Sequence, residues 1–205
     1  MPLPSKRVYY GDYVLFVDEN VYKPAEDSFL FADNLEVEAD ARVLDLGTGC
    51  GIIGILAAEK AGVVVAADVN PYAVRCAKEN AKLNNVRGKM AFVQGDLFTW
   101  LSEKTKFDAI FFNAPYLPVD KGEADSWIGR AWAGGVSGRQ VIDCFISEVP
   151  RYLKQLGRVF LMQSTLADVD ETMRRFADYH LTAGVVAERA LPFFETVVLI
   201  EARFC

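Results

Sequence analysis

Apolar residues along this chain recur with two periods, one typical of β-strands and one typical of α-helices. Residues 8–17 form two short apolar runs on either side of Gly11 and Asp12, which predicts a β-hairpin. A helical pattern follows, from residue 26 to residue 35. We expect these two elements to form an N-terminal extension, residues 1–40, that acts as a lid over a substrate or cofactor.

Beyond this extension, short buried runs alternate with helical patterns through residue 205. The runs that predict strands are 41–46, 63–68, 91–94, 107–112, 158–162, 182–187 and 196–202. The patterns that predict helices are 51–61, 71–81, 141–153 and 169–176. Repeated strand–helix units predict one α/β domain, residues 41–205, with a mostly parallel sheet and helices on both faces. Ligands bind such sheets at the carboxyl ends of the strands, so the residues that follow strands are the candidates for a functional site.

Composition narrows the class of function. The 205 residues are 52% apolar and carry 22 Lys and Arg against 28 Asp and Glu, a net charge of −6. This balance disfavours a nucleic-acid substrate, because proteins that bind nucleic acids need many basic contacts to phosphates. The four cysteines form no CxxC pair and there is one histidine, so we expect no metal site. No apolar run could span a membrane and residues 1–7 carry no secretion signal, so we expect a cytoplasmic or nuclear protein.

A glycine-rich turn, Asp-Leu-Gly-Thr-Gly-Cys-Gly, follows the first predicted strand of the sheet. Its glycines, Gly47, Gly49 and Gly51, allow left-handed backbone and the close approach of a ligand. Asp68 ends the next strand, 23 residues after Asp45, where a carboxylate can bind ribose hydroxyls. The spacing differs from the GxGxxG of dinucleotide sites, and the Asp45 carboxylate would repel a pyrophosphate. The alternative is an ordinary turn with two aspartates that face solvent.

This turn resembles motif I of the class I methyltransferases, which use S-adenosylmethionine. The resemblance implies that Asp45 lies near the methionine amino group of that cofactor and that Asp68 binds its ribose. It also implies that the Asp96 carboxylate accepts a hydrogen bond from the adenine amino group, while Leu97 lies against the base. By itself, an aspartate after a glycine is an ordinary turn.

The sequence Asn113-Ala114-Pro115-Tyr116 follows the strand 107–112 and is the candidate catalytic segment. A planar nitrogen shares its lone pair with a π system and is therefore a poor nucleophile. The Asn113 side-chain oxygen and the Ala114 carbonyl can accept both of its hydrogens, orient it and stabilise the positive charge that develops. Tyr116 can stack on the planar group. The alternative is a turn that only ends a strand.

The segment resembles the Asn-Pro-Pro-Tyr motif of methyltransferases that act on glutamine side chains or on exocyclic amines of bases. Ala114 replaces the first proline, which keeps the carbonyl but removes the fixed φ of proline. Residues 21–28 and 131–139 narrow the resemblance to the single-domain HemK-like branch of eukaryotes and archaea. It covers residues 21–202 and implies a Rossmann-like, seven-stranded α/β fold after a short N-terminal hairpin.

The HemK-like branch methylates N5 of the glutamine in the GGQ motif of class I translation release factors, and the resemblance implies that function here. It implies that Ser28 and Asn113 contact S-adenosylmethionine. The residues expected to bind substrate are Tyr22, Glu26, Asn113, Tyr116 and Trp132. It also implies a small zinc-binding activator subunit that forms a heterodimer with this chain and adds a strand to its sheet.

Other functions stay open from the sequence. Methylation of adenine N6 in DNA or RNA uses the same tetrapeptide, although no target-recognition domain is evident. Another protein methylation, on lysine, has been linked to the same family, but a deprotonated lysine needs no such activation. Because Ala114 departs from the motif, a cofactor-binding scaffold without catalysis is the non-enzyme alternative. The composition of residues 121–125 suggests a loop that contacts substrate.

Overall fold

The computed structural model describes residues 6–120, 125–192 and 195–205. Its strands are β1 Lys6–Tyr10, β2 Tyr13–Val17, β3 Arg42–Leu46, β4 Val63–Asp68, β5 Met90–Gln94, β6 Phe107–Asn113, β7 Leu153–Ser164, β8 Leu181–Ala190 and β9 Thr196–Phe204. Its α-helices are α1 Glu26–Asp33, α2 Ile52–Ala57, α3 Pro71–Leu83, α4 Trp127–Trp132, α5 Gln140–Glu148 and α6 Val169–Asp178. Short 3₁₀ helices lie at η1 Arg87–Lys89, η2 Val149–Arg151 and η3 Thr165–Ala167.

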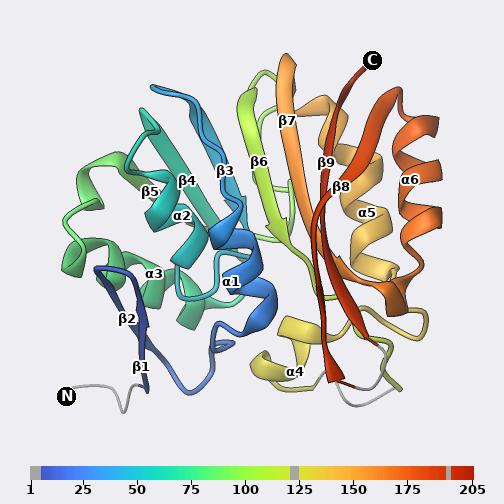
Figure 1. The fold of residues 1–205 in the computed structure, drawn as a ribbon. Helices are drawn as coiled ribbons and strands as arrows, with labels where there is room; N and C mark the ends of the chain where they lie inside the picture. Colours follow the sequence, from blue (N-terminus) through green and yellow to red (C-terminus); the bar gives the residue numbers. More distant parts are fainter. Residues whose placement is uncertain (1–5, 121–124, 193–194) are drawn as a thin grey trace.

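Strands β3 to β9 form one seven-stranded sheet in the order β5-β4-β3-β6-β7-β9-β8. Every pair from β5 to β7 is parallel, and β9 is antiparallel to both β7 and β8. The reversal of β9 follows from the short connection after β8, because only antiparallel neighbours can be joined without a crossover. The predicted mostly parallel sheet is confirmed. In Figure 1 the carboxyl ends of the parallel strands point down and α4 lies below them.

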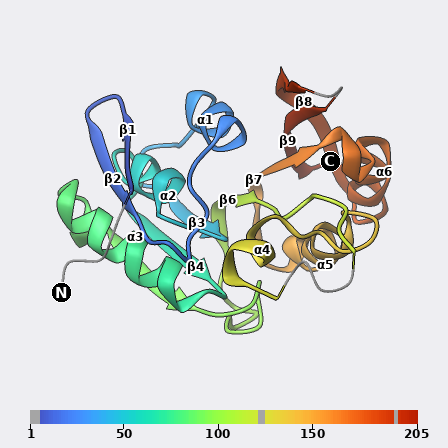
Figure 2. The same cartoon turned by 90° about the horizontal axis from the view of Figure 1, so that it is seen from below.

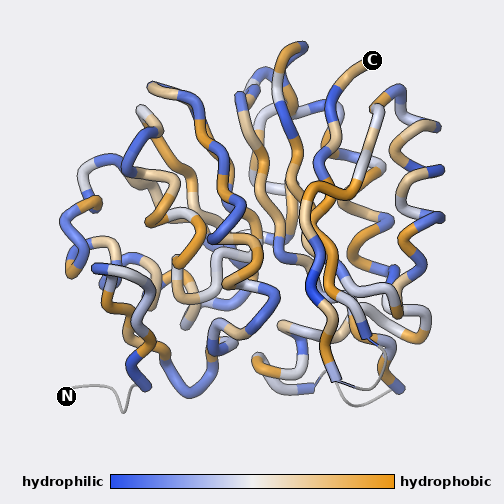
Figure 3. The backbone as a smooth tube through the Cα atoms, viewed as in Figure 1, coloured by the Kyte–Doolittle hydropathy of each residue, from blue (hydrophilic) through white to orange (hydrophobic). Residues whose placement is uncertain are grey.

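Successive strand residues point to opposite faces of the sheet, and each face has its own helices. Val43 and Phe111 belong to the core under α1, α2 and α3, whereas Leu44 and Ile110 belong to the core under α5 and α6. All four side chains are fully buried. Figure 2 shows α1 and α5 on opposite sides of the strands, and Figure 3 shows that apolar positions concentrate along the sheet. The prediction of helices on both faces is thus confirmed.

The predicted N-terminal hairpin is present as β1 and β2, which pair antiparallel. The other edge of β2 is bound by two side chains of α3. The Asn84 amide bonds the backbone N–H and carbonyl of Val14 at 3.1 and 2.9 Å, and the Asn80 amide bonds those of Phe16 at 2.9 and 2.8 Å. Asn80 also donates to the Cys50 carbonyl at 2.8 Å. One helical turn therefore supplies the hydrogen bonds that a third strand would make.

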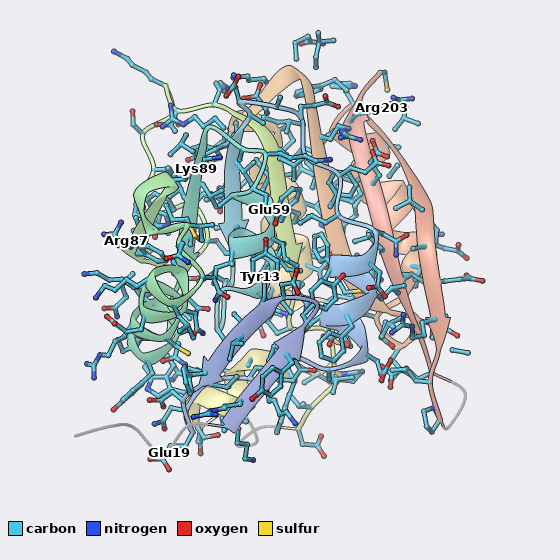
Figure 4. All side chains as sticks on the ribbon, turned by 60° about the vertical axis from the view of Figure 1, so that its left-hand side comes forward. Tyr13, Glu19, Glu59, Arg87, Lys89 and Arg203 are labelled. Atoms are coloured by element: carbon cyan, nitrogen blue, oxygen red, sulfur yellow. The ribbon has the colours of Figure 1, made fainter. Side chains whose placement is uncertain are left out.

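Two tyrosines at the hairpin turn attach it to the helices above it. The Tyr10 hydroxyl donates to Asp33 of α1 at 2.9 Å, and the Tyr13 hydroxyl donates to the Glu59 carboxylate. Figure 4 shows Tyr13 next to Glu59, whose carbonyl also accepts from Lys89 at 3.0 Å. The hairpin is thus fixed against α1, α3 and the end of α2. The division of the chain at residue 40 and the role of a lid stay predictions.

Three predicted features differ from the structure. The helix expected at 51–61 ends at Ala57 and continues only as tight turns. The helix expected at 141–153 ends at Glu148, because Pro150 lacks an N–H, and Leu153 already belongs to β7. Helix α4 was not predicted, since six residues with a central glycine give a weak periodic pattern. The loop expected at 121–125 lies mostly outside the described residues.

No helix in the part of the chain that the structure describes is both long and apolar enough to cross a membrane.

Asn80 should be a large contributor to stability, because it is 1% exposed and bonds the backbone of two other segments. We expect Asn80→Ala to lower the free energy of unfolding by about 3 kcal/mol, since it leaves several buried backbone groups unpaired. Glu79→Ala, on the exposed side of the same helix, should change it by less than about 0.5 kcal/mol. Chemical denaturation of both variants measures this, and equal effects would contradict the role of Asn80.

Candidate active site

A cavity of about 500 Å³ lies at the carboxyl ends of β3, β4 and β6. The predicted site residues that line it are Tyr22, Ser28, Asp45, Gly47, Gly49, Asp68, Asp96, Leu97, Asn113, Ala114, Pro115, Tyr116 and Trp132. Two predicted site residues, Gly51 and Glu26, do not line it. The cavity thus gathers residues that are up to 110 positions apart in the sequence.

Strand register explains this convergence. Leu46 of β3 lies opposite Ala67 of β4 and Phe112 of β6. The residues that follow, Asp68 and Asn113, are therefore level with the start of the glycine turn. Parallel pairing forces all three strands to end at one edge, so their last side chains face the same cavity.

The glycine turn adopts the left-handed backbone that its sequence predicts. Gly47, Gly49 and Gly51 have φ of +61°, +56° and +92°. The Gly49 N–H donates to Asp68 Oδ2 at 2.9 Å, which fixes the turn to the end of β4. A Cβ on Gly51 would lie 3.0 Å from the Cβ of Ala77, so this glycine permits the close packing of α2 on α3. Gly51 thus has a packing role, and the cofactor contact predicted for it stays a prediction.

Asp45 is buried beneath the turn. One oxygen of its carboxylate accepts from the Thr48 hydroxyl at 2.6 Å and from the Gly54 N–H at 3.0 Å. Burial raises the pKa of Asp45 to about 7, against the opposing effect of these two hydrogen bonds. A cationic group in the cavity would stabilise the ionised carboxylate and reverse this shift. Asp45 is therefore suited to a positively charged ligand.

Asp68 and the segment after β5 form the neighbouring wall. The Asp68 carboxylate accepts from the N–H of Gly49 and of Asn70, each at 2.9 Å, and burial raises its pKa. Leu97 has φ of +41°, a strained conformation for a residue with a side chain. A hydrogen bond from the Trp100 indole to the Leu97 carbonyl, 2.8 Å long, holds this turn. Strained backbone of this kind is common where a loop contacts a ligand.

Asn113 ends β6 with its amide held on one side only. Its Nδ2 donates to Asp27 Oδ2 at 3.0 Å and to Ser28 Oγ at 3.4 Å. Its Oδ1 is buried and has no hydrogen-bond partner. A buried carbonyl oxygen without a partner costs free energy, which a ligand that donates a hydrogen bond would recover. The predicted acceptor, Asn113 Oδ1, therefore has no protein donor among the described residues, and Asn113 is one of the residues that line the cavity.

Two tyrosines surround the same carboxylate. The Tyr22 hydroxyl donates to Asp27 at 3.1 Å, and Tyr116 interacts with Asp27 and with Glu195, the residue before β9. Burial, strengthened by these carboxylates, raises the pKa of both tyrosines, so both are neutral. Ala114 beside them is 3% exposed, and its N–H donates to the Met162 carbonyl at 3.4 Å. A proline at this position would lack that donor.

Helix α4 forms the outer wall of the cavity. The Ser126 hydroxyl caps it by accepting from the Gly129 N–H at 2.9 Å. Trp127 and Trp132 line the cavity, and Trp132 is 38% exposed. The predicted substrate residue Glu26 lies outside the cavity and pairs with Arg189 of β8 at 2.8 Å. This ion pair connects α1 to strand β8 of the sheet.

The sequence interpretation missed Asp27 as a site residue. It noted Asp27 only as part of a helix start, because an acidic residue in a first helical turn is ordinary. The one available signal was the run of Glu26, Asp27 and Ser28, since two acidic residues there exceed what capping requires. Within the described ranges, no group of three or more His, Cys, Asp or Glu side chains could hold a metal ion.

Comparison with known proteins agrees with this geometry. Residues 21–128 match the model of the methyltransferase small domain family. A relative in Methanocaldococcus jannaschii, provisionally named a protein N5-glutamine methyltransferase, is 44% identical over 181 residues, which are 87% of this chain and 90% of the relative. Methyltransferase HEMK2 of Homo sapiens is 36% identical over 70% of this chain and 71% of its own length.

A similar solved structure is the Mtq2–Trm112 complex of E. cuniculi, described as responsible for methylation of the eRF1 translation termination factor. Its matching chain is 26% identical, covers 91% of this chain and 99% of its own length, and superposes with a TM-score of 0.70.

The pKa of Asp45 makes a prediction about pH. Because the pKa is about 7 in the folded protein and lower when unfolded, the folded state binds the proton more tightly. The contribution of Asp45 to stability should therefore fall as pH rises from about 4 to about 7. We expect the unfolding free energy of the wild type, relative to Asp45→Asn, to fall over this range and then level off. Denaturation of both proteins at several pH values measures it, and a constant difference would contradict the assignment.

Proposed function

The chain belongs to the methyltransferase small domain family and, within it, to the HemK-like protein N5-glutamine methyltransferases, and from this premise we propose its substrate and cofactor. The chain transfers a methyl group from S-adenosylmethionine to the side-chain nitrogen of the glutamine in the GGQ motif of a class I translation release factor. The names of its relatives and of the matching complex support this substrate.

The residues present fit S-adenosylmethionine. The cofactor carries a cationic amino group, which matches the buried Asp45 beside the glycine turn. The cofactor also carries ribose hydroxyls, from which the Asp68 carboxylate can accept hydrogen bonds. Its adenine can contact the segment of Asp96 and Leu97. When bound, S-adenosylmethionine supplies an electrophilic methyl group on a sulfonium. A cavity of about 500 Å³ has room for the cofactor and for one amide side chain.

The observation that carries the proposal is the unpartnered Oδ1 of Asn113. A glutamine amide has two N–H groups, so it can donate one to this oxygen while its nitrogen faces the methyl group. Hydrogen bonding to Asn113 fixes the direction of attack and stabilises the charge that develops on nitrogen. The neutral Tyr116 can lie against the planar amide. A proton then leaves the nitrogen, and no buried base is required.

A second subunit is the other part of the proposal. The sheet has two open edges, β5 and β8. Strand β8 has a register shift between Val185 and Ala187 and carries Glu188 and Arg189, features that discourage the addition of a strand. Strand β5, Met-Ala-Phe-Val-Gln, has neither a bulge nor a charge. The Mtq2–Trm112 complex supports the presence of a second subunit. Edge β5 is where a small zinc-binding subunit would add its strand.

Methyl transfer from labelled S-adenosylmethionine tests the function. We expect label on a class I release factor, none when the GGQ glutamine is changed to alanine, and none on a DNA duplex. Asn113→Ala should reduce kcat by about 100- to 1000-fold with little change in cofactor affinity, because it removes one aimed acceptor. Label that persists on the Gln-to-Ala factor, or full activity of Asn113→Ala, would refute the proposal.

Substitution at the edge tests the second subunit. Ala91 of β5 is exposed, so Ala91→Arg should leave the fold intact but place a charge at the proposed interface. Co-expression with the small zinc-binding subunit and co-purification should then yield much less complex than the wild type. Val186→Arg on β8, where the side chain is 49% exposed, is the matched control and should have no effect. The reverse pattern would assign the partner to β8.

A further inference from the structure

Asp27 is a buried carboxylate without a cationic partner. It is 5% exposed, and among the described residues no Lys or Arg forms an ion pair with it. Its own backbone neighbour, the Ser28 N–H, donates to it at 2.6 Å. Desolvation of a carboxylate without a cationic partner is costly. A carboxyl group at this buried position therefore calls for a role other than stability.

The carboxylate determines which way the Asn113 amide faces. An ionised carboxylate only accepts hydrogen bonds, so the group that faces it must be the NH₂ of Asn113, at 3.0 Å. The oxygen of the same amide must then point the opposite way, which is where it lies without a partner. If the Asn113 amide were turned by 180°, its NH₂ would face the substrate. It would then repel the substrate N–H groups, from which Asn113 has to accept a hydrogen bond.

The same carboxylate also holds the aromatic side of the site. The Tyr22 hydroxyl donates to its other oxygen at 3.1 Å, and Tyr116 shares this environment. Both oxygens of Asp27 are thus engaged, one by Asn113 and one by Tyr22 and Ser28. A single group at the start of α1 fixes residues from three segments around one point.

We propose that Asp27 is the positioning residue of the reaction, which holds the Asn113 amide with its oxygen toward the nitrogen that accepts the methyl group. The inference rests on the proposed methylation of a planar amide. It goes beyond that function because Asp27 touches neither the methyl group nor the accepting nitrogen and acts only through Asn113.

Substitution of Asp27 by asparagine tests this with almost no change in shape. An asparagine at 27 can donate to Asn113 Oδ1, so the Asn113 amide is free to turn over. We expect Asp27→Asn to lower kcat on the order of 100-fold, with the affinity for S-adenosylmethionine and the melting temperature little changed. The matched control is Asp33→Asn on the same helix, which removes a carboxylate that serves Tyr10 and Arg189 and should alter kcat less than about twofold.

Exchange of the side chains at positions 27 and 113 distinguishes a role of Asp27 in orienting the Asn113 amide from a purely structural role. In the variant Asp27→Asn with Asn113→Asp, the asparagine donates and the aspartate accepts, so an oxygen faces the substrate again. This variant should exceed Asp27→Asn in kcat by roughly tenfold. A merely structural Asp27 predicts that the second substitution only adds damage. An exchanged variant no faster than Asp27→Asn would therefore overturn the proposal.

A measurement without substrate keeps this test independent of the proposed function. The Asn113 side-chain NH₂ signals of ¹⁵N-labelled protein should exchange slowly with solvent in the wild type and faster in Asp27→Asn. Slow exchange together with failure to methylate any release factor would leave the positioning role intact and refute only the function. Equal exchange in both proteins, or normal kcat in Asp27→Asn, would overturn the positioning role.

Discussion

Parallel pairing of β4, β3 and β6 is the constraint on which the site depends. Because Leu46 lies opposite both Ala67 and Phe112, each strand delivers its next residue at the same level. A shift of one residue in either pair would turn Asp68 or Asn113 to the opposite face of the sheet. The cores on the two faces oppose such a shift, since it would move buried side chains such as Phe111 and Ile110 of β6 from one core to the other. The packing of the two cores thus fixes the relative positions of Asp68 and Asn113 at the site.

The residues carried by this register could be predicted from the sequence. Asp45, Asp68 and Asn113 follow strands with strong apolar patterns, and the glycine turn has the left-handed backbone that its spacing indicates. The role of Asp27 could not be predicted, because it depends on a side chain 86 positions away. Helix α4 was missed because its stability comes from a serine cap and from packing at the cavity, which periodicity does not report.

In the part of the chain that the structure describes, three carboxyl groups at the site have only neutral hydrogen-bond donors as partners. Asp27, Asp45 and Asp68 all bind N–H or O–H groups, and none forms an ion pair within the described residues. Neutral donors keep these carboxyl groups in place but supply no positive charge. A cavity of this kind favours ligands and reaction steps that bring positive charge. Methyl transfer from a sulfonium to a neutral nitrogen moves positive charge through the cavity, which such a field suits.

Helix α1 is bound both by a residue that precedes it in the sequence and by one that follows it. Asp33 accepts from Tyr10 of the N-terminal hairpin at 2.9 Å and pairs with Arg189 of β8 at 3.2 Å, while Glu26 pairs with the same arginine. On a ribosome, α1 emerges about 160 residues before Arg189, so its ion pairs with Arg189 form only later. Until strand β8 is made, α1 lacks its ion pairs with Arg189. Helix α1 is therefore expected to reach its final packing late in synthesis, when β8 and β9 complete the sheet.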